Sequence, residues 1–195
     1  MKVDKELIEH VAELARLKLT NEEIEKFLPQ LKEILRRVKT LEHQGYEFER
    51  ADASFALLIL GILHRKWKSP FKVKSSHISI RCVGKDSINE VTIEMRVGEK
   101  FHHEVAKGDG PVNALDRALR KGLMKSFPQL KRVKLVDYSV RILKGMAGTR
   151  AKTRVLIVST DDSRKWTTVG VNENIITASL EALVDSMKFA LMPKA

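Results

Sequence analysis

Polar and apolar positions alternate along two stretches of this chain, and each stretch ends in a helical pattern. The alternation is typical of half-buried strands. It runs over 71–83, 89–97 and 100–108, and again over 134–143, 153–160 and 165–171. Apolar residues at helical spacing follow each set, from Pro111 to Phe127 and over 174–191. The pattern therefore predicts two successive units of three strands and a helix.

The likeness of the two units extends beyond the order of their elements. A glycine-containing turn opens each helix, as GDGPVNALDRAL in the first unit and GVNENIITASLEAL in the second. We interpret this as an internal duplication, with halves 71–128 and 129–195 that face each other across a pseudo-twofold axis. Because each sheet has to bury one face beneath helices, the predicted fold class is α+β.

Helical spacing dominates the first 41 residues. Apolar positions recur at helical intervals over 4–19 and again after Thr20, which predicts an N-terminal helical hairpin spanning 1–41. Thr20 and Glu23 have the spacing of a capping box at the start of the second helix. Pro29 is expected to kink or restart that helix. Two helices this short should pack on the rest of the chain or on another protein.

A linker helix is expected between the hairpin and the first strand, within 42–70. Gly45 breaks the preceding helix, and Asp52 is a candidate N-cap for the new one. Ser69 precedes a proline and therefore resists helical geometry. We place the boundary of the duplicated domain at residue 71.

Composition narrows the classes of function that fit. The 195 residues are 43% apolar and 31% charged, which is enough for a real core. No run approaches the roughly 18 to 20 apolar residues of a membrane helix, and the N-terminus carries no apolar signal core. The single cysteine, Cys82, excludes an internal disulfide and a cysteine-based zinc site, and we interpret it as a small hydrophobe in a strand. We expect a cytoplasmic protein without a membrane, metal or cofactor.

The net charge of +11 raises the question of an acidic partner. Seven basic residues lie close together and only Asp116 opposes them: Arg117, Arg120, Lys121, Lys125, Lys131, Arg132 and Lys134. One interpretation is a face for nucleic acid, and the other is a solvated helix end. Aromatic residues make up only 6% of the chain and offer little surface for stacking bases, so we do not expect nucleic acid.

Other candidate motifs point to structure. The GxGP sequence lacks the lysine of a phosphate loop and the third glycine of a dinucleotide fingerprint. His102 and His103 are adjacent on a strand, so their side chains face opposite ways and cannot share a metal easily. Asp161-Asp162 is expected to form a turn with Ser163, and Trp67 and Trp166 to be core or interface anchors.

Several longer strings support a family resemblance. They are LEHQGYEFERADASFALL (41–58), GDGPVNALDRALRK (108–121), KLVDYSVRIL (134–143), GTRAKTRVLI (148–157) and TVGVNENIITASLEALVDSM (168–187). In these strings, residues from about 40 to 195 resemble the C-terminal regulatory region of citramalate and 2-isopropylmalate synthases. The resemblance implies a non-catalytic, dimeric module that binds the end-product amino acid, isoleucine or leucine.

In that family a catalytic barrel precedes the regulatory region and condenses acetyl-CoA with a 2-oxo acid on a divalent metal. No barrel fits in residues 1–70, so we do not expect this chain to be an enzyme. A barrel on another chain is one possible partner. Residues 1–36 also resemble, more weakly, the small C subunit of the tRNA-dependent Asp/Glu amidotransferase, a helical hairpin that braces its catalytic partner. An accessory scaffold subunit therefore stays an alternative, as does the helical linker of the synthases.

The loop at 108–113 is the candidate effector site. The start of a helix offers free N–H groups and partial positive charge, which suit the carboxylate of an amino acid. Gly108 and Gly110 are expected to allow close backbone approach and positive φ angles, and Pro111 suits the first helical turn. The alternative is a plain turn without a ligand.

The remaining candidate residues would surround the rest of the amino acid. Val112, Ile142, Ala151 and Ile175 are expected to form an apolar pocket. The resemblance implies that the loop, with Asn113, and Tyr138 lie around the effector near the dimer interface. Asp109 stands where the family commonly has asparagine, so it would either repel the carboxylate or engage the ammonium.

Overall fold

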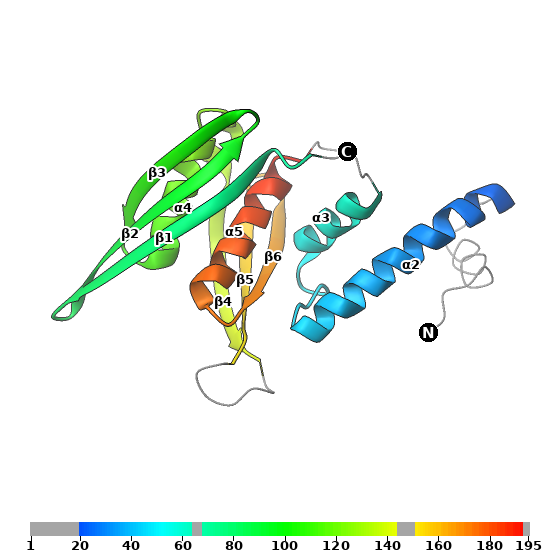
Figure 1. Ribbon diagram of the computed structural model, residues 1–195, viewed down its shortest axis with the longest axis horizontal. Helices are drawn as coiled ribbons and strands as arrows, with labels where there is room; N and C mark the ends of the chain where they lie inside the picture. Colours follow the sequence, from blue (N-terminus) through cyan, green and yellow to red (C-terminus); the bar gives the residue numbers. More distant parts are fainter. Residues whose placement is uncertain (1–19, 64–67, 144–150, 193–195) are drawn as a thin grey trace. The chain divides into compact units, whose positions relative to one another are not determined.

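The computed structural model describes residues 20–63, 68–143 and 151–192 (Figure 1). These residues belong to two compact units. One contains helix α2 (Asn21–Gln44), and the other combines residues 45–57 with the chain from residue 68 onward. The two units are described separately below.

Helix α2 begins at the predicted capping box. The Glu23 carboxylate accepts from the Thr20 backbone N–H at 2.8 Å, and Thr20 Oγ1 accepts from the Glu23 N–H at 3.3 Å. The helix then runs through Pro29 without interruption, so the expected restart is wrong. It ends before Gly45, whose φ of 108° favours glycine. The expected helix at 4–19 lies outside the described residues.

The larger unit holds two three-stranded antiparallel sheets with the strand orders β1-β2-β3 and β4-β5-β6. Sheet A contains β1 (Phe71–Val83), β2 (Asp86–Val97) and β3 (Lys100–Gly108), and α4 (Pro111–Leu123) follows it. After a short 3-10 helix, η1 (Pro128–Arg132), sheet B contains β4 (Lys134–Ile142), β5 (Thr153–Thr160) and β6 (Lys165–Asn172), and α5 (Ile175–Ala190) closes it. Figure 1 shows each helix against one face of its own sheet. The α+β class and the repeated units are thereby confirmed.

The two halves repeat each other residue by residue. The buried positions of α4 are Ala114, Leu115, Ala118, Leu119, Gly122 and Leu123, and those of α5 are Ala178, Ser179, Ala182, Leu183, Ser186 and Met187. Each pair is 64 positions apart, as in 178 − 114 = 64. The first strand of each half also carries one extra residue at the same place, Lys74 in β1 and Val136 in β4. A shared bulge at one register position is strong support for duplication.

Both halves contribute to one continuous core. Val91 and Ile93 of sheet A, Val155 and Ile157 of sheet B, and the inner faces of both helices all belong to it. Each half alone would leave apolar surface uncovered, so the halves stabilise each other.

The two halves fill one core position differently. In the second half the Trp166 indole donates to Ser186 Oγ at 3.0 Å, and Ser186 is 2.7 Å from Ser159 Oγ. The corresponding first-half residues are His102, Gly122 and Met95. A side chain at Gly122 would lie 2.8 Å from the Met95 sulfur, so the sulfur occupies the space that the serine hydroxyls use in the other half.

Residues 45–57, here named the strap, lie along the outer edge of β6. Asp52 accepts from the Thr167 N–H at 2.8 Å, and Ser54 Oγ accepts from the Val169 N–H at 3.1 Å. The next outward N–H of this edge, that of Val171, donates to Glu181 of α5 at 3.1 Å. Asp52 was predicted as an N-cap, but its carboxylate accepts from a strand amide instead. Three side chains occupy the donors of an edge strand that would otherwise be open to pairing.

Buried carboxylates hold the strap against α5. The Tyr46 hydroxyl donates to Glu181, and Ser54 donates to Asp185 at 3.1 Å. Burial raises the pKa of Glu181 despite its bonds from Tyr46 and Val171. Burial also raises the pKa of Asp185, although Lys188, 3.7 Å away, opposes the rise. Both carboxylates are costly to keep charged.

Substitution of Gly170 tests the closeness of α5 to sheet B. A Cβ at this position would overlap the Ala178 carbonyl oxygen and lie 2.9 Å from the carbonyl carbon. We expect Gly170→Ala to lower the free energy of unfolding by about 3 kcal/mol, measured by urea denaturation. Gly61→Ala in α3 (Asp52–Leu63) is the control, because nothing lies within 4 Å of its added Cβ. Equal effects of the two changes would contradict the close approach.

The buried Asp185 predicts a pH dependence. Because its pKa is raised in the folded state, its favourable contribution is complete below the unfolded pKa and is lost as pH rises through the folded pKa. The difference in unfolding free energy, wild type minus Asp185→Asn, should therefore fall with rising pH, by at most about 1.4 kcal/mol per unit. Denaturation between pH 4 and 8 measures it. A difference that grows with pH would contradict the buried-carboxylate interpretation.

Candidate functional site

The start of α4 has an open set of backbone donors. Gly110 is the N-cap, in extended conformation with φ −150°, and no side chain caps the helix. The first intrahelical bond, from Ala114 N–H to the Gly110 carbonyl, is 2.9 Å long. The amides of Val112 and Asn113, which a capping side chain would normally satisfy, have no such partner among the described residues.

The two glycines of this loop have different roles. A Cβ at Gly108 would overlap the Ala114 amide nitrogen and lie 2.8 Å from its Cα, so the close approach expected there is present. Nothing lies within 4 Å of a Cβ at Gly110. Neither glycine has a positive φ, so that part of the prediction is wrong. Gly110 keeps an extended backbone between β3 and α4, so the chain enters the helix without a left-handed residue.

A buried amide side chain lies beside this helix start. Asn89 pairs with Gly108 across sheet A and is 1% exposed. Its Nδ2 donates to Ser87 Oγ at 2.9 Å and to the Asp109 carbonyl at 3.4 Å. Its Oδ1 is buried and has no partner among the described residues. A buried acceptor without a donor is costly and marks a place where a ligand group or water is expected.

Asp109 points away from the helix start. Its side chain is 91% exposed, and the Arg117 guanidinium lies 3.7 Å from it. Its backbone N–H donates to Asn113 Oδ1 at 3.3 Å. The negative charge is therefore partly balanced and faces solvent.

The start of α5 is built differently. Asn174 is the N-cap, and its Oδ1 accepts from the Ile176 N–H at 2.8 Å. One donor at the start of α5 is thus satisfied by a side chain of the protein, whereas no side chain caps the start of α4.

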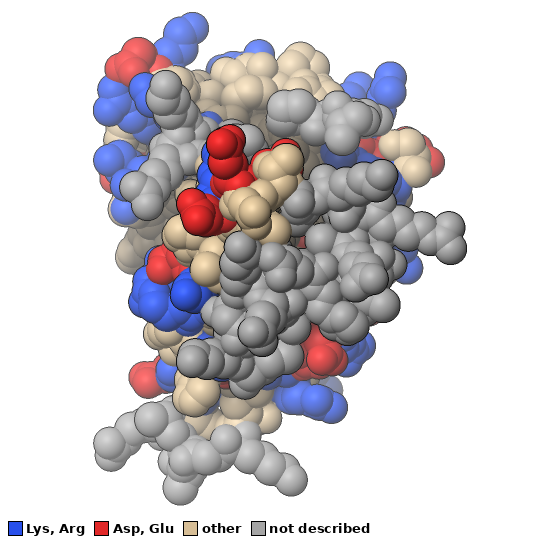
Figure 2. All heavy atoms as spheres, turned by 90° about the vertical axis from the view of Figure 1, so that its right-hand side faces the viewer, with Lys and Arg blue, Asp and Glu red and all other residues tan. Residues whose placement is uncertain are grey.

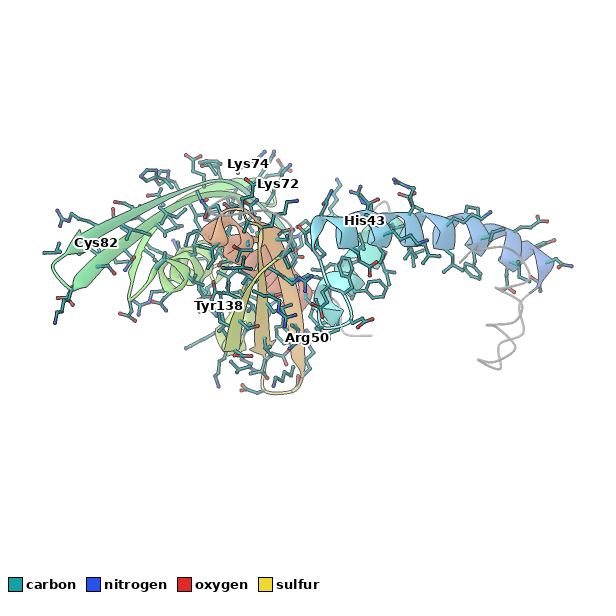
Figure 3. The ribbon with its side chains drawn as sticks, turned by 90° about the horizontal axis from the view of Figure 1, so that it is seen from below. His43, Arg50, Lys72, Lys74, Cys82 and Tyr138 are labelled. Carbon is teal, nitrogen blue, oxygen red and sulfur yellow. The ribbon has the colours of Figure 1, made fainter. Side chains whose placement is uncertain are left out.

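Tyr138 connects sheet B to the first turn of α5. Its hydroxyl lies 2.9 Å from Ser179 Oγ, which in turn donates to the Ile175 carbonyl at 2.7 Å. The structure therefore brings Tyr138 and Ile175 together, and Figure 3 shows Tyr138 within sheet B.

Ile142 and Ala151 lie at the same end of sheet B. Ile142 pairs with Thr153, which pairs with Asn172 just before α5. Ile142 is 70% exposed and Ile175 is 41% exposed, so these side chains form no closed pocket within one chain. The loop at 108–113 belongs to the other half, where Val112 packs against the same core as Tyr138.

The basic cluster is largely paired. Arg120 forms an ion pair with Asp116 at 2.7 Å and donates to the Leu130 carbonyl, and Lys121 lies 3.3 Å from Glu104. Arg117 and Lys134 also have acidic partners. These ion pairs favour the structural interpretation of the cluster. Figure 2 draws the side at the right of Figure 1, and both basic and acidic side chains are exposed on it.

The other candidate residues have structural surroundings. Figure 3 shows Cys82 at the far end of the β1–β2 hairpin; it lies in a strand as predicted, and its side chain is exposed. The hairpin continues past the end of β3 at Gly108, and there the sheet has only two strands. His102 and His103 face opposite sides as predicted, since they pair with Met95 and Glu94.

The remaining motifs are turns and core anchors. Asp161 accepts from Ser163 and Arg164 and forms the expected turn, while Trp166 is buried and Trp67 lies outside the described residues. Within the described ranges no three His, Cys, Asp or Glu side chains gather as a metal site. None of the helices described there is long and apolar enough to span a membrane.

The fold and the two helix starts define a duplicated module in which each three-stranded sheet carries one helix. The family model for the LeuA allosteric (dimerisation) domain matches residues 49–191. The chain is also 48% identical to (R)-citramalate synthase of Geobacter sulfurreducens over 163 residues, which are 82% of this chain and 30% of the relative. It is 44% identical to the Aquifex aeolicus (R)-citramalate synthase over 91% of this chain and 34% of the relative.

The chain therefore belongs to the LeuA allosteric (dimerisation) domain family, the regulatory and dimerisation domain of citramalate and 2-isopropylmalate synthases. A 2-isopropylmalate synthase of Methanocaldococcus jannaschii is 26% identical over 81% of this chain and 28% of the relative. The chain spans about a third of the length of these relatives.

The longest of these alignments bears on the N-terminal region. An alignment that covers 91% of 195 residues leaves out about 18 at most, so it has to include all of α2. Helix α2 thus falls within the similarity to a citramalate synthase. This favours the synthase's own helical linker over a fused amidotransferase-like segment.

A double-mutant cycle tests the link between Tyr138 and α5. We expect Tyr138→Phe to lower the unfolding free energy by about 1 kcal/mol, because Ser179 loses one hydrogen-bond partner. In the Ser179→Ala background the same change should cost clearly less, since the partner is already absent. Urea denaturation of the four proteins gives the coupling. Strictly additive effects would mean that the two hydroxyls do not interact.

Proposed function

We propose that this chain is an amino-acid-sensing module that binds isoleucine or leucine as a homodimer. In this proposal the bound amino acid reports the level of an end product to a catalytic barrel of the synthase type. Family membership supports a regulatory and dimerising role, and the proposal adds the ligand and where it binds.

The unequal capping of the two helices is the observation that carries the proposal. Asn174 accepts from the Ile176 N–H at the start of α5, whereas Gly110 offers no capping side chain to α4. Free helix-start amides and the positive end of the helix dipole bind carboxylates well. A capping side chain at residue 110 would remove this capacity, and the chain has glycine there.

Asn89 supplies a partner for the second charged group of an amino acid. Its buried Oδ1 lacks a donor among the described residues, and an ammonium group is a strong donor. In our proposal the carboxylate binds the amides of Val112 and Asn113, and the ammonium binds near Asn89. The exposed Asp109, which lies 3.7 Å from Arg117, contacts neither charged group of the ligand in this proposal.

The apolar side chain of the ligand needs further surface. We propose that Val112, Tyr138, Ile142, Ala151 and Ile175 supply it, the last four from the second half of the domain. The strongly exposed Ile142 and Ile175 would be covered in the dimer, which agrees with an effector that lies near the interface.

Ligand binding should raise the melting temperature. A ligand at 100 times its dissociation constant stabilises the folded state by about 2.7 kcal/mol. We expect isoleucine or leucine alone among the twenty amino acids to give this shift, in a protein that sediments as a dimer. Differential scanning fluorimetry measures the shift, and sedimentation measures the oligomeric state.

Gly110→Asn is the sharpest test of the site. It copies the Asn174 cap into an extended position where an added Cβ meets nothing within 4 Å. We expect the free protein to keep or slightly raise its stability and the ligand-induced shift to fall, because the new side chain occupies the amides. Asp109→Asn, which removes an exposed charge from the same loop, should keep the shift. An unchanged shift in Gly110→Asn would exclude the α4 amides as the carboxylate site.

A further inference from the structure

A hollow lies on the face of sheet B opposite α5. Its volume is about 240 Å³. The strap contributes Glu47 and Arg50, and the strands contribute Ser139–Arg141, Arg154 and Leu156. Figure 3 shows Arg50 beside the strands of sheet B. The hollow is thus formed between the strap and the sheet, on the side where Tyr46 and Phe48 pack against Leu156 and its neighbours.

The charges around this hollow are unequal. Three guanidinium groups line it, and the only carboxylate is that of Glu47. Glu47 already forms an ion pair with Arg154, whose Nε also donates to the Gly45 carbonyl at 2.6 Å. Arg50 and Arg141 make no ion pair or side-chain hydrogen bond with any other described residue. Two positive charges, from two different segments, therefore remain without a counter-charge around one hollow.

The lining of the hollow suits an anion. Arg50 and Arg141 are exposed, so solvent weakens their mutual repulsion, and Leu156 forms an apolar part of the wall. A bound anion would accept forked hydrogen bonds from the guanidinium groups. The volume of about 240 Å³ has room for a small molecule.

We propose that this hollow binds a small dianion, a dicarboxylate or a phosphate, between Arg50 of the strap and Arg141 of β4. Ser139 offers a further hydroxyl donor, and the Arg154–Glu47 pair fixes one wall. The ligand connects the strap to sheet B and tightens the cap on the edge of β6. This site is on the face of sheet B opposite α5, and its proposal does not depend on the amino-acid proposal.

Titration with malate and with inorganic phosphate tests the proposal. Calorimetry at constant ionic strength should show that at least one of them binds to the wild type, while acetate, a monoanion, binds at least tenfold more weakly. Binding of malate alone assigns a dicarboxylate, and binding of phosphate alone assigns a phosphate. Absence of binding by both would overturn the proposal, and so would equal binding of acetate.

Matched variants locate the site. Arg50→Gln and Arg141→Gln should each weaken binding by about tenfold or more, because each removes charged hydrogen bonds to the ligand. Both side chains are exposed and unpaired, so the variants should fold normally. Arg81→Gln, an equal loss of charge on exposed β1, should bind as the wild type does. Binding that is equally weakened in all three variants, or in none, would overturn the assignment.

The rate of hydrogen exchange at the edge of β6 gives a second measurement. Removing a positive charge does not by itself change this rate, whereas a tighter attachment of the strap does. The Thr167 and Val169 amides donate to Asp52 and Ser54 of the strap, so they report its attachment. The bound dianion should slow their exchange in the wild type and leave it unchanged in Arg50→Gln. Equal protection in both proteins would contradict the connection between strap and sheet.

Discussion

The close approach of each helix to its three-stranded sheet is the contact on which the rest of this domain depends. Small residues make it possible: Ala114, Ala118 and Gly122 on α4, and Ala178 and Ala182 on α5. Gly170 allows the second helix to reach the backbone of β6. The same closeness places the start of α4 directly after β3 and beside the buried Asn89. Geometry that serves packing thus also forms the candidate site.

The two halves share the same order of strands and helix, but their side chains form different polar contacts. The second half satisfies its own polar groups: Trp166 bonds to Ser186, Asn174 caps α5, and the strap occupies the edge of β6. The first half leaves Asn89 Oδ1 and His102 Nε2 buried without partners among the described residues. The second half therefore uses its polar groups for internal hydrogen bonds. The first half keeps buried polar atoms that are open to a ligand or a water molecule.

Local pattern predicted the strands and helices well, because alternation and helical spacing are properties of neighbouring residues. The restart expected at Pro29 was wrong, because α2 continues through this residue although a proline there removes one hydrogen bond and crowds the preceding turn. Positive φ at Gly108 and Gly110 was wrong because close approach and left-handed geometry are separate reasons for glycine.

The candidate site was only partly accessible to the same reasoning. The loop from Gly108 to Asn113 was identified, but Asn89 was missed, because one polar residue near a hairpin looks like part of a turn. The strap contacts join residues more than a hundred positions apart, such as Tyr46 and Glu181, and no local pattern encodes them.

The outer edge of β6, whose amides donate to side chains of the strap and of α5, has one more consequence. A sheet that offers a free edge on only one side can add a single neighbour there and cannot grow further, so strand pairing between copies of this sheet terminates at a pair instead of extending into a fibre.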